Sequence, residues 1–98
     1  MDERYELTFT DRARLDLLQA RRWLRQPGSG LRAQLRLTRI NRAIIELEFA
    51  PLRWTFGRHP GVRVRLIEGY SVHYSVEVSQ KTVTIRRVFS PYQDQSRL

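Results

Sequence analysis

The sequence predicts one α+β domain with the element order β-α-α-β-β-β. Apolar and polar residues alternate in four short runs, at 5–9, 62–66, 70–78 and 83–89, and this period of two is typical of strands with one buried face. Between the first two runs, apolar residues instead recur every three or four positions, which indicates amphipathic helices. A chain of 98 residues can bury only one core, so we expect a single domain over residues 1–98.

The first strand leads directly into the first helix. Tyr5, Leu7 and Phe9 form the apolar side of the strand. Thr10 then stands at the position of a helix N-cap, and Asp11 favours the positive end of the helix dipole. The buried stripe of this helix is expected at Ala13, Leu17, Ala20 and Leu24.

A Pro-Gly-Ser-Gly turn at 27–30 separates this helix from a second one, expected from about Leu31 to Phe49. Pro51 ends it. Between residues 12 and 42 the only acid is Asp16, so the helical hairpin is strongly basic. The core side of the second helix is expected at Leu37, Ile40, Ile44 and Leu47, with Leu35, Ile45 and Phe49 beside it.

The second and third strands are expected to form a hairpin whose outer face is basic. If Leu66 and Tyr70 are direct neighbours on the buried face, the loop holds the three residues 67–69, with Gly69 in a left-handed conformation. This register predicts an outward strip in which Arg65 lies opposite Ser71, and Arg63 opposite His73.

The last strand raises a question at Arg87. The loop 79–82 is expected to let Val78 pair with Val83, and Val83 and Ile85 then point inward. Arg87 would follow them inside, so either a bulge brings Val88 inward or Arg87 is partly buried with a partner. The remaining residues, 90–98, contain few apolar groups and are expected to be weakly ordered.

Composition limits the classes of partner. The formal charge of +8 comes almost wholly from arginine, whose guanidinium group binds carboxylates and phosphates with two hydrogen bonds. We therefore expect acidic protein or nucleic acid as a partner. The chain has no cysteine and no apolar run near the roughly 20 residues that span a bilayer, so a cytoplasmic protein without membrane contact is expected. No metal-ligand spacing or phosphate-binding glycine loop is present, and we expect no metal and no cofactor.

Short motifs along nearly the whole chain resemble the ParE/RelE superfamily of bacterial type II toxins. The matching pieces are Tyr5 to Phe9 leading into Asp11-Arg12-Ala13 and Asp16-Leu17, Ile44 to Pro51, Gly61-Val62-Arg63, Gly69-Tyr70, Val72, Tyr74, and Ile85 to Phe89 with Gln93-Asp94 beyond. The resemblance implies a small twisted, mainly antiparallel sheet with a helical hairpin on one face. It also implies an acidic antitoxin as partner, ParD-like or another small DNA-binding protein.

The superfamily divides by target, and the resemblance favours one branch. RelE-like enzymes, which cut messenger RNA on the ribosome, carry arginines where this chain has Ser71 and, near the end, Pro91. Each missing cation would remove a contact to the transition state. The run Arg87-Val88-Phe89 followed by Gln93-Asp94 looks instead like the ParE branch, whose members inhibit DNA gyrase by binding. Many ParE-like chains have a histidine where Ser90 stands, so this match is imperfect.

Three functions therefore stay open: first a gyrase inhibitor that is not itself an enzyme, then a ribosome-dependent mRNA endonuclease, and third a basic nucleic-acid-binding module. No catalytic residue is expected for the first; the second would use His73, Arg63, Arg65 and Arg86. Target contact is expected from Arg63, Arg65, Arg86, Arg87, Phe89 and Tyr92. Antitoxin contact is expected from Arg14, Arg21, Arg22, Trp23, Arg36 and Arg39. Trp54 and Phe56 could stack on bases, but are more simply explained as closing one end of the core.

Overall fold

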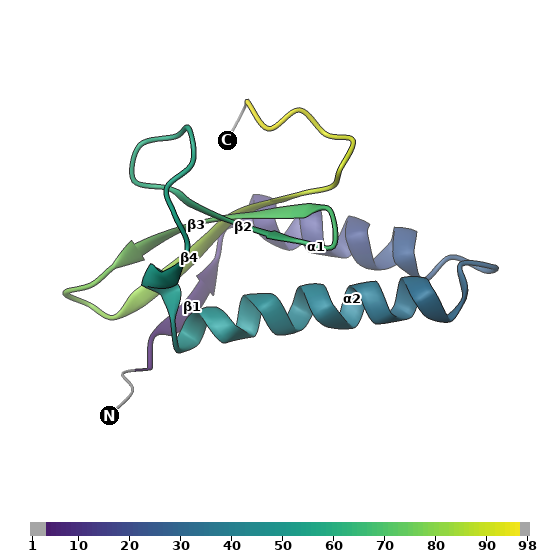
Figure 1. The fold of residues 1–98 in the computed structure, drawn as a ribbon, viewed down its shortest axis with the longest axis horizontal. Coiled ribbons are helices and arrows are strands. Elements are labelled where there is room, and N and C mark those ends of the chain that lie inside the picture. The colour runs from purple at the N-terminus through teal and green to yellow at the C-terminus, as the bar shows by residue number, and fades with distance from the viewer. Residues whose placement is uncertain (1–3, 97–98) are drawn as a thin grey trace.

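The computed structural model describes residues 4–96 and confirms the predicted order of elements (Figure 1). The strands are β1 (Glu6–Phe9), β2 (Arg63–Ile67), β3 (Tyr70–Glu77) and β4 (Thr82–Phe89). The helices are α1 (Asp11–Leu24) and α2 (Gly30–Ile45), followed by two short 3-10 turns, η1 (Glu46–Glu48) and η2 (Pro51–Arg53). Within the described residues, neither helix is long and apolar enough to cross a membrane.

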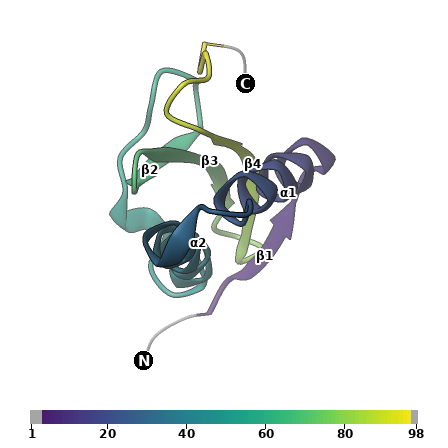
Figure 2. The same ribbon diagram turned by 90° about the vertical axis from the view of Figure 1, so that its right-hand side faces the viewer.

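The sheet has the strand order β1-β4-β3-β2, in which β1 runs parallel to β4 and the other neighbours are antiparallel. The helices form a hairpin (Figures 1 and 2). They pack on the face of the sheet that carries Val72, Tyr74 and Ile85, which are fully buried. We call this the helix face and the opposite side the outer face.

The start of α1 agrees with its sequence. The Thr10 hydroxyl accepts a hydrogen bond from the Ala13 backbone N–H (3.0 Å) and donates one to the Arg86 carbonyl (2.8 Å). One side chain therefore both caps the helix and fixes it to β4. Ala13, Ala20 and Leu24 are buried as predicted.

The second helix ends at Ile45, earlier than the predicted Phe49. Its core residues are buried as expected at Ile40, Ile44 and Leu47. Leu35, Ile45 and Phe49 do not join them and are 45%, 54% and 53% exposed. Leu35 and Ile45 are each five positions from Ile40, so they lie about 140° around the helix from it, and Phe49 lies beyond the end of the helix.

The predicted register of β2 is wrong by one residue. Ile67 lies opposite Tyr70, Arg65 opposite Val72 and Arg63 opposite Tyr74. The turn holds only Glu68 and Gly69, with φ of 53° and 82°, and such a two-residue turn suits the twist of a hairpin. Because side chains alternate between faces, a slip of one residue in the register moves every side chain of β2 to the opposite face of the sheet. Arg63 and Arg65 therefore project from the helix face, and Val64 and Leu66 from the outer face.

The pairing of β3 with β4 answers the question about Arg87. A bulge follows Ile85, so that Tyr74 lies opposite Ile85 while His73 lies opposite Arg87, and Arg86 is the extra residue. Val88 turns inward and is buried, yet Arg87 is buried too. Both predicted alternatives occur together. The predicted pair of Val78 with Val83 is wrong, since Val83 lies opposite Val76 and Val78 is in the turn.

The segment after β4 packs against the outer face. In Figure 1 it crosses over β2 and β3 on the side away from α2. Ser90 donates its backbone N–H to the Gln93 side chain (2.8 Å), and Gln95 contacts both histidines. Residues 90–96 thus have polar contacts to the rest of the chain, and the expected weak order of this segment stays a prediction. Residues 97 and 98 lie outside the described chain.

Candidate functional site

The predicted arginine strip is not on the outer face. The Arg63 guanidinium donates to the Trp54 carbonyl and lies 4.1 Å from the centre of the Phe56 ring. Arg65 donates to the Ala43 carbonyl (3.0 Å), pairs with Glu46 (3.0 Å) and stacks on Trp54 (4.5 Å). Only 14% of the Arg65 side chain is exposed.

These two arginines connect β2 to the end of α2 and to the loop after it. The Trp54 and Phe56 rings lie against the guanidinium groups. Trp54 packs against the core as expected, whereas Phe56 is 60% exposed, so the expectation that it closes one end of the core is wrong for Phe56. Tyr74 completes the attachment by donating its hydroxyl to the Pro51 carbonyl (2.6 Å). Burial raises the pKa of Tyr74 to about 12, so this hydroxyl keeps its proton at neutral pH.

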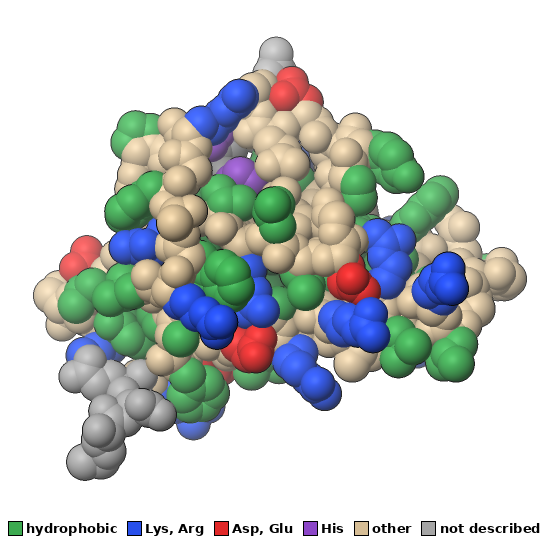
Figure 3. Space-filling model, in the orientation of Figure 1, with side chains coloured by type: hydrophobic (Ala, Val, Ile, Leu, Met, Phe, Trp, Pro, Cys, Tyr) green, Lys and Arg blue, Asp and Glu red, His purple; other side chains and the backbone are tan. Residues whose placement is uncertain are grey.

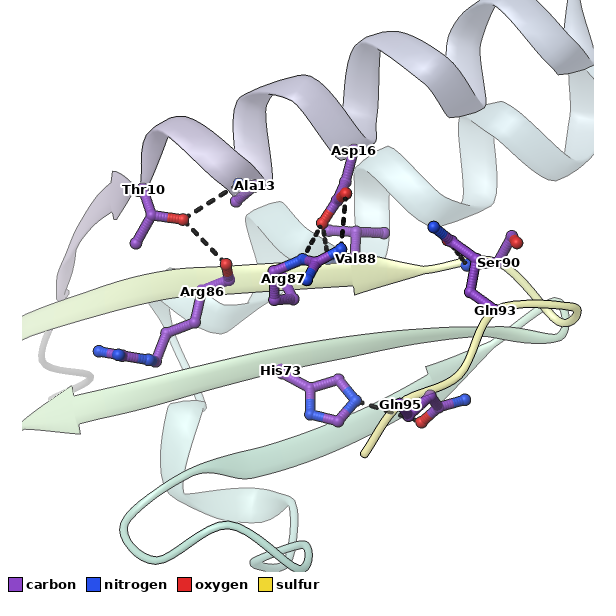
Figure 4. A network of polar contacts seen from close by, with 10 residues as sticks. All are labelled: Thr10, Ala13, Asp16, His73, Arg86, Arg87, Val88, Ser90, Gln93 and Gln95. Carbon is purple, nitrogen blue, oxygen red and sulfur yellow. Dashed lines mark hydrogen bonds and ion pairs between the residues drawn. The ribbon is translucent and has the colours of Figure 1, made fainter. Parts of the chain in front are cut away.

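His73 lies on the outer face as predicted, but it is only 3% exposed. Its Nε2 lies 3.2 Å from the Gln95 side-chain oxygen (Figure 4). Nε2 of His59 lies 3.2 Å from the Gln95 carbonyl. The ring also meets Phe89 edge to face at 5.0 Å. Burial lowers the pKa of His73, assisted by the nearby charges of His59 and Arg87, although the bond to Gln95 opposes the shift. The prediction of a solvent-facing histidine is wrong, because the tail covers it.

Arg87 forms a buried ion pair with Asp16 of α1 (Figure 4). Its Nε and Nη2 atoms lie 2.8 and 3.3 Å from the two Asp16 oxygens, and the Val88 backbone N–H donates to the same carboxylate (2.9 Å). Asp16 thereby satisfies the β4 backbone beyond the end of β1. Sequence reasoning missed this pair, although a lone acid three residues from Ala13 on the core stripe was the available signal.

The residues predicted for target contact differ in accessibility. Arg87 and Phe89 are 9% and 2% exposed, so both side chains are buried within the fold, and their contact with a target stays a prediction. Arg63 and Arg65 are held on the helix face. Arg86 and Tyr92 are exposed, Tyr92 by 93%, and their contact with a target stays a prediction.

A groove of about 440 Å³ lies between α1 and the segment after β4. Trp23 forms part of one wall, Tyr92 part of another, and Arg36 and Tyr70 line it as well. Arg36 donates to the Glu68 carbonyl (2.8 Å), which places its charge at the groove. We call this cavity the groove.

The groove brings together two of the six residues predicted for antitoxin contact, Trp23 and Arg36. Arg39 forms an ion pair (2.9 Å) with Glu68, the residue whose carbonyl Arg36 contacts. Arg21 precedes Trp23 by two residues, which places it about 200° around α1 from Trp23 and so on another side of the helix. Arg14 and Arg22 are exposed and line no part of the groove. Within residues 4–96, no three histidine, aspartate or glutamate side chains gather into a group that could hold a metal ion.

Comparison with known proteins identifies the fold. A chain of the chromosomal ParDE toxin–antitoxin system from P. aeruginosa superposes with a TM-score of 0.71 at 20% identity, covering 90% of this chain and 97% of that chain. The chain has the ParE/RelE toxin fold. A chain of the RelBE2 toxin–antitoxin complex from Mycobacterium tuberculosis matches with a TM-score of 0.58 and 26% identity, over 92% of this chain and 97% of that one. The isolated E. coli RelE toxin gives a TM-score of 0.53 and 22% identity, over 93% and 88%. No protein-family model matches the sequence, and no curated protein matches it significantly.

Proposed function

We propose that this protein is the toxin of a type II toxin–antitoxin system and that it acts as ParE-like toxins do, by binding and inhibiting DNA gyrase. The fold shared with chains of ParDE and RelBE systems supports the toxin class. The same neighbours support an antitoxin as partner. A basic surface, with a net charge of +8, suits an acidic partner.

One observation carries the choice of binding over RNA cleavage. A nuclease of this kind needs a base, an acid and cations around one phosphate. Here His73 is on the outer face under Gln95, whereas Arg63 and Arg65 are on the helix face with the sheet between them. Of the four residues that a nuclease would use, only Arg86 is exposed. The set does not converge, which favours a protein that acts by binding.

A RelE-like endonuclease remains the second candidate, because the sequence is 26% identical to a chain of a RelBE complex. For this activity the tail would have to leave the outer face, uncovering His73 near Arg87. That rearrangement would still leave Arg63 and Arg65 on the helix face.

Two assays on the purified protein separate the candidates. We expect inhibition of gyrase supercoiling, reversed by the protein encoded in the adjacent reading frame, and intact mRNA on translating ribosomes. Arg86→Glu should weaken the inhibition if the exposed cation at the bulge meets gyrase. Glu77→Gln, an exposed change at the far end of β3, serves as the control. Codon-specific mRNA cuts abolished by His73→Gln, with supercoiling unaffected, would instead establish the nuclease.

A further inference from the structure

The solvent-facing side of α2 carries regularly spaced apolar residues. Leu31, Leu35 and Ile45 are 70%, 45% and 54% exposed, although each is large and apolar. With the exposed Thr38 and Arg42 they follow steps of four, three, four and three residues. We call Leu31, Leu35, Thr38, Arg42 and Ile45 the α2 seam.

The α2 seam lies on the opposite side of the helix from the core residues Ile40 and Ile44. Phe49, 53% exposed, continues the spacing by one more step beyond the end of the helix. In Figure 1 the sheet lies above α2, and no other element of the described chain lies below it. Figure 3, in the same orientation, shows hydrophobic and basic side chains together along this lower edge. An ordinary surface helix would be polar here. The apolar residues therefore indicate a surface that another molecule covers.

The spacing also indicates the shape of that molecule. Alternating steps of three and four residues are those of a seam between two packed helices, in which each side chain enters a space between residues of its neighbour. A helix of 16 residues is about 24 Å long and can be matched by a partner helix of similar length. The α2 seam is thus suited to one amphipathic helix rather than to an extended strand.

The charges on α2 exclude a second copy of this chain as the preferred occupant. The helix contains four arginines and no acid. Arg36 and Arg39 already contact Glu68, but Arg32 and Arg42 have no ion-pair partner among residues 4–96. Arg42 stands inside the α2 seam, so covering it without an acid would cost affinity. The α2 of another copy offers no acid to Arg42 in either direction of packing.

We propose that the α2 seam binds an amphipathic helix of a separate, acidic protein. Such a helix presents apolar residues at matching steps of three and four. It places Asp or Glu against Arg42 and along the flank that carries Arg32. This inference rests on the proposed function, in which the acidic protein is the antitoxin, and it adds a contact surface that is distinct from the groove.

The test compares three variants that each replace an exposed leucine or isoleucine by aspartate. Leu35→Asp and Ile45→Asp change the α2 seam, and Leu66→Asp makes the same change in charge at a residue 71% exposed on β2. We expect each seam variant to weaken binding of the adjacent frame's product by about tenfold or more, as for a central contact of an interface. The Leu66 control should change the affinity less than about twofold. Thermal melting of the free variants confirms that all three are folded.

A second probe removes the dependence on the natural partner. A synthetic helix of about four heptads, with leucine in its seam and glutamate beside it, should bind the wild type and lose affinity to both seam variants and to Arg42→Gln. Equal binding of the antitoxin to all variants would overturn the inference while the proposed function stands. Binding of the synthetic helix but not of the frame's product would support the seam and count against the proposed function. A wild-type dimer that becomes monomeric with Leu35→Asp would identify a second copy as the occupant and refute the proposal.

Discussion

At the scale of single residues, the environment of His73 depends on parts of the chain that are far away in sequence. Gln95 covers its Nε2 atom, and His59 approaches from the loop before β2 with its ring centre 6.4 Å away. Arg87 contributes a positive charge from the neighbouring strand. Its own counter-charge, Asp16, lies on α1. The neutral imidazole is therefore the form that the fold prefers.

This preference predicts a loss of stability in acid. Because the pKa of His73 is lowered in the folded chain, the unfolded chain, with a pKa near 6.5, binds a proton that the folded chain does not. The contribution of neutral His73 to the free energy of unfolding is complete above pH 6.5 and decreases as the pH falls below that value. We expect urea unfolding between pH 7.5 and 5 to show a smaller loss for His73→Gln than for the wild type. Equal losses would mean that other groups cause the pH dependence.

At the scale of elements, local patterns predicted more than pairing patterns did. The Thr10 cap and the buried stripes of both helices were predictable because caps and helical periodicity depend on neighbouring residues. The face of β2 was not, because alternation defines two sets of side chains without saying which set is inward. The two-residue turn at Glu68 and Gly69 decides it, and a three-residue loop fitted the sequence equally well. Burial of Arg87 was foreseen only as an alternative, since its partner Asp16 is on another element.

Asp16 connects α1 to the part of β4 that extends beyond the end of β1, and its removal should be costly. Asp16→Ala leaves the Arg87 guanidinium buried without a counter-charge and the Val88 N–H without an acceptor. We expect a loss of about 3–5 kcal/mol in the free energy of unfolding, measured in urea.

The matched control is Glu48→Ala, which removes the partner of Arg4, a side chain 72% exposed. It should cost less than about 1 kcal/mol. Adding Arg87→Met to Asp16→Ala should recover part of the loss, because the buried charge is then gone. If the double variant is no more stable than Asp16→Ala, the effect belongs to the Val88 N–H or to packing rather than to the unpaired guanidinium.

At the scale of the whole molecule, the basic charge and the exposed apolar surface act together. The helix face is used for the core, and arginines of β2 are used inside the fold. The outer face is partly covered by the chain's own tail. On the helical hairpin, the groove and the α2 seam stay accessible to a partner, and each includes an arginine. Composition predicts an acidic partner, and this stays a prediction. The surfaces that would receive the partner depend on how the helices turn, so they could not be predicted from charge alone.

The final prediction concerns how salt affects binding of the antitoxin. With a net charge of +8, association with an acidic protein should be fast and sensitive to ionic strength. Screening shortens the range of charge from about 8 Å at 0.15 M to about 3 Å at 1 M salt, so the association rate should fall steeply across that interval. Dissociation should change less, because apolar contacts along the α2 seam are insensitive to screening. Surface plasmon resonance at several salt concentrations measures both rates, and Arg42→Gln should reduce the salt dependence of association whereas Leu66→Gln should not. An association rate that is constant from low to high salt would show that shape and apolar contact, rather than the arginines, select the partner.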